Sequence, residues 1–442
     1  MKIGEMASVE QRELQDELAS GKQSHEVSES SSPTMAQVVS RNNLIAALRQ
    51  VQRNRGAPGI DGMSVEELSG YLKNHWPTIK ADLLAGNYRP QPVRRVEIAK
   101  ANGGVRALGI PTVLDRFIQQ SIAQVVQTDW EPVFHDASYG FRPGRSAHQA
   151  LRQTQDHLRS GYDWVVDCDL ESFFDRVNHD RLMRRLKTRV DDQVLLKTIN
   201  RYLKAGVEID GGKHPSARGV PQGGPLSPVL ANIVLDELDW ELAHRGHRFV
   251  RYADDFQIYV KSQVAAERVM HSITYFVANT LRLTVNQQKS AVARPWERVF
   301  LGCTFTRRRD YRLKVAERSL ERLKSTVRAV SRRTRGHSIV QVVAELKKSL
   351  LGWKAYFDIA EVLSPLRDLD KWIRRRLRCY QWKQWGRAGY RRLRRLGISR
   401  ELAWNTAKSA HGPWRLSASP ALTLSLSNGY YKKLGLPELA TR

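Results

Sequence analysis

Three aspartates stand where they could hold metal ions. Asp169 ends an apolar stretch that begins at Trp164, and Asp254 and Asp255 interrupt a second one, Phe249–Val260. Carboxylates buried near one another cost free energy unless cations neutralise them, and oxygen ligands favour hard cations such as Mg²⁺. Two such ions, about 3.5–4 Å apart, could activate a hydroxyl group and stabilise a leaving pyrophosphate. The alternative is that these are unrelated aspartates of turns.

The two apolar stretches are predicted to be buried strands. Residues 164–170 alternate, so that Asp167 and Asp169 lie on the face opposite Val166 and Cys168. Residues 249–260 are typical of a hairpin with the two aspartates at its tip. Between the strands, residues 228–242 have the apolar spacing of a helix. The sequence therefore predicts that regular elements position all three acids.

Two further elements precede these strands. Residues 37–52 have helical apolar spacing, and the Gly-Ala-Pro-Gly run at 56–59 ends that pattern. Residues 94–110 are predicted to form a hairpin whose turn is Asn-Gly-Gly at 102–104. Residues 1–36 are acidic and rich in Ser, and we expect a tail without fixed structure there.

Positive charge is concentrated toward the C-terminus. The chain has 72 Lys and Arg against 45 Asp and Glu, a net charge of +27, and residues 307–442 alone hold 33 basic and 10 acidic residues. A region of this kind is expected to bind a polyanion, although a merely well-solvated helical domain is the alternative. Within it, residues 366–385 carry an apolar stripe typical of a core-facing helix. The arginines around the stripe are candidates for nucleic-acid binding: Arg374, Arg375, Arg376 and Arg378.

Composition excludes several other classes of protein. The three cysteines, Cys168, Cys303 and Cys379, are far apart, so neither a disulfide framework nor a thiolate zinc site is expected. No apolar run is long enough to span a bilayer, and the first residues lack the pattern of a signal peptide. We therefore expect no membrane partner and a reducing, cytoplasmic location.

Four segments resemble, in order, the sequence boxes of reverse transcriptases. They are residues 139–146 (YGFRPGRS), 167–175 (DCDLESFFD), 219–228 (GVPQGGPLSP) and 251–256 (RYADDF). Residues 37–63, the GGPLSP run at 223–228 and residues 351–357 (LGWKAYF) resemble the group II intron lineage in particular. The chain ends without a Cys/His-rich segment, and so it resembles the bacterial class that lacks an endonuclease domain. This resemblance implies a bacterial protein that is associated with the nucleoid.

The resemblance implies an α+β fold, namely a right-hand polymerase with fingers, a palm built on an antiparallel sheet and a helical thumb, followed by a basic helical maturase and DNA-binding region. We expect an N-terminal extension and fingers at 37–160, the palm at 161–305, the thumb at 306–365 and the basic C-terminal region at 366–442. Two Mg²⁺ ions would be the cofactors. Asp169 and Asp254 would bridge them, Asp255 would be an additional acid, and the Leu170 carbonyl would be a further ligand.

The same resemblance assigns the remaining site residues. Those that would hold the deoxynucleotide are Lys100, Arg106, Phe174, Gln222 and Lys289. Phe174 would be the wall that excludes a ribose 2′-hydroxyl, although Phe173 and Phe174 could both be core residues. Lys289 would protonate pyrophosphate, although an exposed lysine without a role is the alternative. Leu301 and Gly302 would grip the primer, and Arg142 and Arg145 of the first box would contact nucleic acid.

The implied function is RNA-directed DNA synthesis for a group II intron, together with binding of intron RNA that assists splicing and mobility by target-primed reverse transcription. The partners would be intron RNA, a DNA primer or target, and deoxynucleoside triphosphates. Two alternatives remain at this point. One is a related reverse transcriptase released from any intron and used in DNA repair or phage defence. The other is a splicing cofactor without polymerase activity, against which the intact acids argue.

Overall fold

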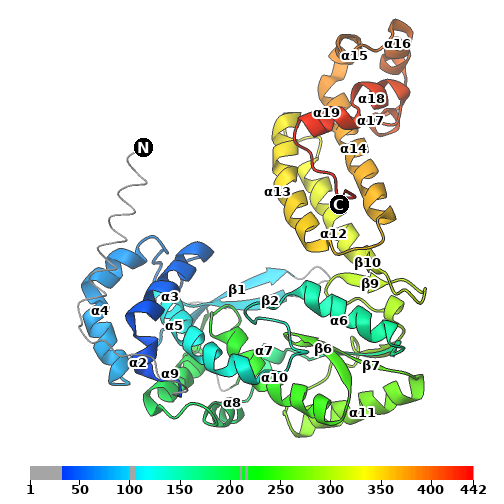
Figure 1. Ribbon diagram of the computed structural model, residues 1–442. Helices are drawn as coiled ribbons and strands as arrows, with labels where there is room; N and C mark the ends of the chain where they lie inside the picture. Colours follow the sequence, from blue (N-terminus) through cyan, green and yellow to red (C-terminus); the bar gives the residue numbers. More distant parts are fainter. Residues whose placement is uncertain (1–31, 100–104, 210–211, 215–217, 442) are drawn as a thin grey trace. The chain divides into compact units, whose positions relative to one another are not determined.

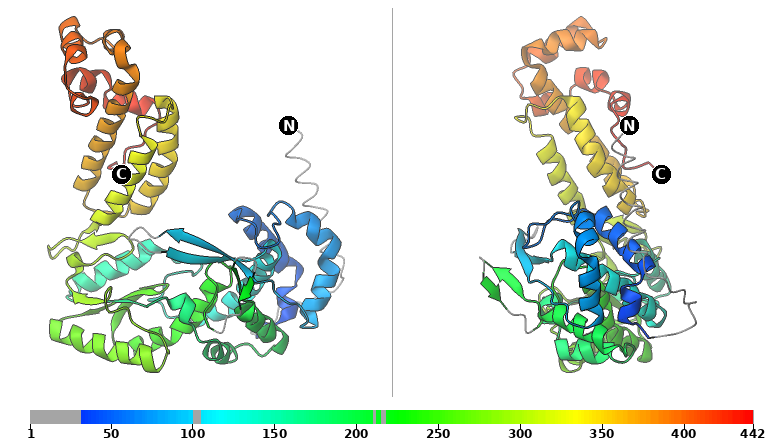
Figure 2. Two further views of the ribbon diagram at one scale, coloured as in Figure 1. Left: turned by 180° about the vertical axis from the view of Figure 1, so that it is seen from behind. Right: turned by 90° about the vertical axis from the view of Figure 1, so that its left-hand side faces the viewer.

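The three aspartates lie at one end of a four-stranded sheet in a computed structural model that describes residues 32–99, 105–209, 212–214 and 218–441 (Figures 1 and 2). The strand order is β6-β7-β3-β8. β3 pairs antiparallel with β7, and β7 pairs antiparallel with β6. The strands are β3 (Trp164–Asp169), β6 (Arg248–Tyr252), β7 (Asp255–Val260) and β8 (Ala291–Ala293).

Helices α10 (Ser227–His244) and α11 (Gln263–Asn279) pack against this sheet. The apolar residues of α10 occur on every side of the helix, and they are buried almost throughout. β3 is likewise buried on both faces, with Val165 and Val166 at 1% and 0% exposure. A sheet covered in this way is rigid, so it can hold side chains at its end in fixed places. The predicted strands and the predicted helix at 228–242 are confirmed.

A second sheet, of order β2-β1-β4-β5, contains the predicted hairpin at 94–110. Its turn lies outside the described residues. The helices and strands of this part of the chain are α2 (Met35–Val38), α3 (Arg41–Asn54), α4 (Leu68–Leu84), β1 (Val93–Ala99), β2 (Val105–Ile110), α5 (Val113–Trp130), η1 (Glu131–Val133), α6 (Ala147–Arg159), α7 (Phe173–Arg176), α8 (His179–Leu186), α9 (Gln193–Lys204), β4 (Val207–Ile209) and β5 (Gly212–His214).

The expected N-terminal tail is partly folded. Most of it lies outside the described residues, but its last residues begin helix α2, which Thr34 caps through its side chain. The Met35 amide donates a hydrogen bond to Asp192 at 2.7 Å, and the Ser32 hydroxyl donates one to the Arg189 carbonyl at 2.9 Å. Contacts with residues distant in the sequence therefore give residues 32–36 a fixed structure, whereas their local composition predicted a tail without one.

A buried carboxylate, Asp115, holds the start of α5 against its surroundings. It is 1% exposed and accepts hydrogen bonds from the hydroxyls of Tyr88 (2.8 Å), Tyr202 (3.0 Å) and Thr112 (2.8 Å) and from the Gln91 amide (3.1 Å). Burial raises the pKa of this carboxyl above its ordinary value. No cation is among these partners, so hydrogen bonds alone offset the loss of hydration.

Replacing Asp115 with alanine is expected to lower the free energy of unfolding by about 2–4 kcal/mol, because several buried donors would lose their acceptor. The folded-state pKa is raised, so Asp115 contributes most stability at acidic pH, and this contribution falls as pH rises through that pKa. Urea denaturation at several pH values measures both effects. The exposed Asp82→Ala in α4 serves as the control, and an equal loss in both variants would contradict this role.

The chain divides into two compact units, and the second comprises Gln155–Asp163 with the residues from Ala293 onward. In it, α12, α13 and α14 lie side by side (Figures 1 and 2). Its remaining elements are η2 (Pro295–Glu297), β9 (Cys303–Phe305), β10 (Leu313–Val315), α12 (Glu317–Val330), α13 (Ile339–Phe357), α14 (Ser364–Trp385), η3 (Gly386–Ala388), α15 (Gly389–Arg395), α16 (Arg400–Lys408), α17 (Pro413–Leu416), α18 (Pro420–Ser425) and α19 (Asn428–Lys433).

This division falls at residue 293, whereas the expected boundary between palm and thumb at residue 305 stays a prediction. β9 pairs with β10 in a separate two-stranded sheet, which places residues 293–305 in the second unit. The predicted apolar stripe of α14 is confirmed, since its members are all buried: Leu366, Leu369, Ile373, Leu377 and Tyr380. The α+β class is confirmed as well.

The three cysteines and the hydropathy of the helices can be described in the structure. Cys168, Cys303 and Cys379 are free and buried, and burial raises the pKa of the Cys303 thiol to about 12. A thiol with so high a pKa is a poor nucleophile. Within the part of the chain that the structure describes, no helix is long and apolar enough to cross a membrane.

Candidate active site

Strand register brings the catalytic candidates together. In the β3–β7 ladder Asp169 is directly opposite Asp255, and in the β6–β7 ladder Asp255 is opposite Tyr252. Only Ala253 and Asp254 therefore connect β6 to β7. All three aspartates are partly exposed, whereas Phe256, one residue further into the sheet, is fully buried. The acids therefore lie at a boundary between an apolar core and solvent.

The end of β3 is fixed by the segment at 284–290. The Asp169 amide donates to the Ser290 hydroxyl at 3.0 Å, and the Asn286 amide donates to the Asp169 carbonyl at 2.8 Å. Leu170 forms a bridge with Val285. The ammonium group of Lys289, from the same segment, lies 2.8 Å from Asp169 Oδ2. The backbone and the side chain of Asp169 are thus held by one loop.

The residues present fit a hard divalent cation. The candidate ligands are carboxylate and carbonyl oxygens, the donors that Mg²⁺ prefers. The ammonium group of Lys289 forms an ion pair with Asp169 and so places a positive charge beside this carboxylate. Among the described residues, however, no group of three His, Cys, Asp or Glu side chains converges closely enough to hold an ion. The site therefore has donors of the right chemical type, and binding an ion would require these side chains to move closer together.

Phe173 and Phe174 differ in exposure, and Phe174 also packs against the core. Phe173 is buried, while Phe174 is partly exposed, and their rings meet edge to face at 5.2 Å. The Phe174 carbonyl accepts a hydrogen bond from the Val220 amide at 2.6 Å. Gly219 has a φ of +91°, and a Cβ there would lie 2.9 Å from the Phe174 carbonyl oxygen. The third box of the sequence therefore fixes Phe174 from its backbone.

The turn that bears Gln222 packs on the strand that bears Arg106. The Gly109 amide of β2 donates to the Gln222 carbonyl at 2.7 Å, and a Cβ on Gly223 would lie 2.5 Å from the Gly109 carbonyl oxygen. Gly223 has a φ of +130°, which favours glycine. Arg106 pairs with Ile98 in the backbone ladder. Lys100 lies outside the described residues.

Leu301 and Gly302 form a tight turn in the second unit. Phe300 and Cys303 exchange two backbone hydrogen bonds of 2.9 Å, and the two residues between them have φ of +49° and +77°. The Leu301 carbonyl accepts a hydrogen bond from the Tyr356 hydroxyl at 3.0 Å, and the Gly302 carbonyl accepts one from the Ser319 hydroxyl at 2.9 Å. A Cβ on Gly302 would lie 3.1 Å from Ser319 Oγ, so the turn favours glycine at this position.

Residues 98–305 match the family of reverse transcriptases, described as RNA-dependent DNA polymerases. Residues 320–397 match the maturase-specific domain of group II introns. The chain is 34% identical over 309 residues to protein YkfC of Escherichia coli K12, a match that covers 60% of this chain and 81% of YkfC. The chain belongs to the group II intron reverse transcriptase and maturase family.

The chain has other relatives. It is 30% identical over 334 residues to the group II intron-encoded protein LtrA of Lactococcus lactis, which covers 61% of this chain and 55% of LtrA. It thus spans about half the length of that relative. A solved structure of telomerase from Candida albicans matches with a TM-score of 0.43 at 14% identity, over 66% of this chain and 59% of that one.

Arg142 was predicted to contact nucleic acid, but its side chain is buried. Its side chain is 3% exposed and lies 2.8 Å from Glu131, and its guanidinium also donates to the carbonyls of His135 (2.7 Å) and Ser138 (2.9 Å). A guanidinium buried in this way cannot reach a phosphate, so Arg142 is a structural residue. Arg145 is 28% exposed and pairs with Asp136 at 2.5 Å.

The arginines of α14 are half-buried and bond within the second unit. Arg378 donates to the Ser417 carbonyl at 2.9 Å, Arg376 donates to the Ser331 hydroxyl at 3.2 Å, and Arg374 lies 3.8 Å from Glu438. Arg375 stacks on Trp414 at 4.3 Å. Packing between helices therefore accounts for the contacts of these four arginines, and the ring of Trp414 beside Arg375 is 40% exposed.

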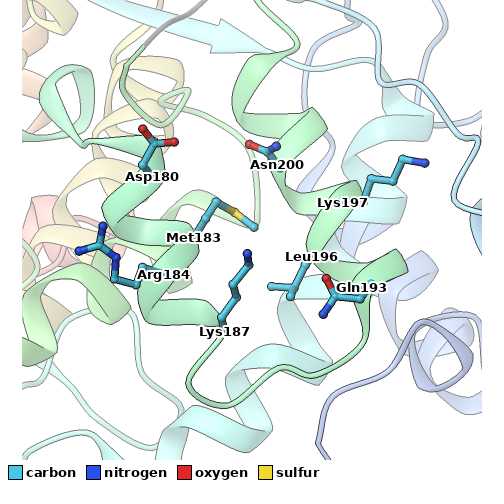
Figure 3. Close-up of a pocket in the computed structure, with 8 residues that line it drawn as sticks. All are labelled: Asp180, Met183, Arg184, Lys187, Gln193, Leu196, Lys197 and Asn200. Atoms are coloured by element: carbon cyan, nitrogen blue, oxygen red, sulfur yellow. The ribbon is translucent and has the colours of Figure 1, made fainter.

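A basic cleft between α8 and α9 was not indicated by the sequence (Figure 3). It has a volume of about 480 Å³, and the side chain of Met183 points between the two helices. The residues that line it are Asp180, Met183, Arg184, Lys187, Gln193, Leu196, Lys197 and Asn200. None of the predicted site residues is among them. Because its charged residues are ordinary for exposed helix faces, only the pairing of α8 with α9 reveals the cleft.

Arg251, the first residue of the fourth box, was given no role in the sequence analysis. It precedes the tyrosine of the fourth box and is completely buried, with Asp239 as its partner. A signal was present in the sequence, because an arginine within an otherwise apolar strand must find an acidic partner when it is buried.

Proposed function

We propose that the chain synthesises DNA on an RNA template, using Asp169, Asp254 and Asp255 as its acidic centre. The observation that carries the proposal is the strand register that brings Asp169 and Asp255 opposite each other, with Asp254 in the connecting turn. The match to reverse transcriptases over residues 98–305 supports it. Residues 37–160 would form the N-terminal extension and fingers, 161–305 the palm, and 306–365 the thumb.

Two Mg²⁺ ions are proposed as cofactors. The Asp169, Asp254 and Asp255 carboxylates and the Leu170 carbonyl would hold them. When bound, the ions would supply charge neutralisation for the attacking 3′-hydroxyl and the leaving pyrophosphate. The protein itself contributes a rigid sheet end, and Lys289 would give up its contact with Asp169 as the ions enter.

The deoxynucleotide is proposed to lie between Phe174 and the turn that bears Gln222. The partly exposed ring of Phe174 would form a flat apolar wall with neither room nor partner for a 2′-hydroxyl. Gln222 lies 3.5 Å from Asp175, and the glycine after it allows the turn to pack closely on β2. Lys100 and Arg106, which flank the predicted turn at 102–104 in the sequence, would bind the triphosphate.

Replacing Lys289 with methionine is expected to lower the rate of nucleotide incorporation about 10- to 100-fold, if its ammonium group protonates pyrophosphate once released from Asp169. A simple exposed lysine would have no such effect. Single-turnover extension across a range of pH is the measurement, because loss of a general acid also removes one limb of the pH profile. The exposed Lys187→Met, directly after α8, is the control. An unchanged pH profile in the Lys289 variant would refute the assignment.

We also propose that the protein binds the RNA of its intron as template and as splicing substrate, with target DNA as primer. The match of residues 320–397 to the maturase-specific domain supports this partner, and so does the excess of basic residues after Arg307. Residues 366–442 would form a basic nucleic-acid-binding region. The exposed arginines of α15 and Arg375 are better candidates for RNA contact than Arg142.

Splicing of a transcript made from the DNA around the gene tests the intron role. The transcript would be incubated at low Mg²⁺ with and without the protein. Splicing that depends on the protein is the expected result. If that DNA forms no self-splicing intron, while the protein still extends primers on RNA, the enzyme acts outside an intron, as in DNA repair or phage defence.

A further inference from the structure

A buried ion pair lies directly behind the turn that bears Asp254. Arg251, near the end of β6, and Asp239 of α10 both have side chains that are 0% exposed. Arg251 Nε donates to Asp239 Oδ1 at 2.7 Å, and a second nitrogen donates to the other carboxylate oxygen. This is the two-point geometry in which arginine and a carboxylate bind most strongly.

The remaining donors of the same guanidinium reach the turn and its neighbours. One nitrogen donates to the Ala253 carbonyl at 2.9 Å and to Asn232 Oδ1 at 3.0 Å, and the other also donates to the Ser138 hydroxyl at 2.7 Å. Arginine has five N–H donors, so every one of them has an acceptor here. Lysine, with a single compact charge, could not satisfy this arrangement.

The turn that Arg251 holds has an unfavourable backbone. Ala253 has a φ of +59°, a conformation that residues other than glycine adopt rarely. Arg251 accordingly binds the carbonyl of the residue that is strained. Asp254 and Asp255 follow it directly, so a rotation of the Ala253 peptide would move both carboxylates.

The segment at 137–140 closes the turn from the other side. The Tyr139 amide donates to the Arg251 carbonyl at 2.9 Å, and Asn232 donates to the Gly140 carbonyl at 2.9 Å. A Cβ on Gly140 would lie 2.3 Å from the Ala253 nitrogen. The Arg251–Asp239 ion pair, Asn232 and Gly140 together hold the backbone of Ala253 in a single conformation.

We propose that Arg251 and Asp239 are positioning residues, which set the backbone of residues 253–255 so that the carboxylates of Asp254 and Asp255 are placed to receive metal ions. The proposal rests on the proposed function. Stability alone would not require a charged pair here, since well-packed apolar residues often replace a buried ion pair without loss. What apolar residues cannot replace is the hydrogen bond to the Ala253 carbonyl.

The test compares three variants of the full chain with wild type. Arg251→Lys keeps the charge and loses the five-donor geometry, and the double variant Arg251→Met with Asp239→Leu removes the pair without leaving a lone charge. The matched control is Arg185→Met with Asp236→Leu. That ion pair (2.6 Å) joins α8 to the same helix α10 and includes a buried aspartate that feels the charges of Asp239 and Arg251, while Arg185 itself bonds to Asp236 and not to the turn.

Two measurements are made on each folded variant. Hydrogen exchange of the peptide covering 249–260 reports on the turn whether or not the protein is active, and single-turnover extension over a range of Mg²⁺ concentrations reports on the acids. Positioning predicts faster exchange at the turn, a rate about 10- to 100-fold lower and a higher half-saturating Mg²⁺ concentration in both Arg251 variants. The Arg185 control should keep wild-type exchange in that peptide and a wild-type Mg²⁺ dependence.

Either of two results would overturn the proposal. One is a folded Arg251 and Asp239 double variant whose turn exchanges at the wild-type rate. The other is the same shift of exchange in the Arg185 control, which would make the effect one of general stability. If wild type extends no primer, the proposed function fails, and hydrogen exchange still decides whether the pair holds the turn.

Discussion

Asparagine in place of Asp254 is expected to lower the rate of DNA synthesis at least about 1,000-fold. The change removes one negative charge and keeps the size of the side chain, so the turn between β6 and β7 should persist. The loss of charge weakens the binding of the ions, which contribute several kcal/mol to the transition state, and each 1.36 kcal/mol is a factor of ten. Single-turnover primer extension at saturating nucleotide measures the effect.

Binding of RNA gives this experiment its internal control. The Asp254 variant should bind RNA and melt as wild type does, because the basic residues after Arg307 are unchanged. Asp180→Asn, which removes a carboxylate from α8 instead, should extend primers normally. An Asp254 variant with more than a tenth of wild-type activity would show that the turn does not carry the catalytic acids.

Valine in place of Phe174 is expected to reduce discrimination against ribonucleotides by about 100-fold, the upper range for steric differences in an apolar pocket. The ring is partly exposed, and its backbone is fixed by Val220 and Gly219. Shortening the side chain should therefore open space for a 2′-hydroxyl without moving the strand end. The ratio of kcat/KM for dCTP to that for CTP is the quantity to measure.

Two further variants are controls for the measured change in discrimination. Tyr275→Val removes an aromatic ring that is 67% exposed on α11 and should leave discrimination unchanged. Phe173→Val should lower stability, because Phe173 is a core residue, and should change discrimination less than Phe174→Val does. If Phe173→Val has the larger effect on discrimination, Phe173 and not Phe174 is the residue that excludes the 2′-hydroxyl.

Local sequence patterns predicted several of the helices and strands of the fold. Alternation predicted β3, because it follows from the two-residue period of a strand. The apolar run around Asp254 and Asp255 predicted the hairpin, because strands buried on both faces are apolar throughout. The apolar stripe of α14 was predicted for the corresponding reason in a helix. These features depend on neighbours in the chain, and so they can be read from one sequence.

Features that depend on distant residues could not be predicted in this way. Arg142 looks like other arginines of a basic chain, and only the carbonyls and the carboxylate that fold around it show that it is buried. The cleft between α8 and α9 exists only once the helices pair. The partners of Arg251 lie 12, 19 and 113 residues away, in addition to Ala253, and no local pattern connects them.

The measurement that comes first is extension of a DNA primer on an RNA template by the full chain, with deoxynucleotides and Mg²⁺, in parallel with a reaction in which EDTA removes the metal. Long products that require both the RNA template and Mg²⁺, and that disappear in the Asp254→Asn variant, are the predicted result. Folded wild-type protein that binds RNA but extends nothing on RNA or DNA templates would contradict the assignment and leave a splicing cofactor without polymerase activity.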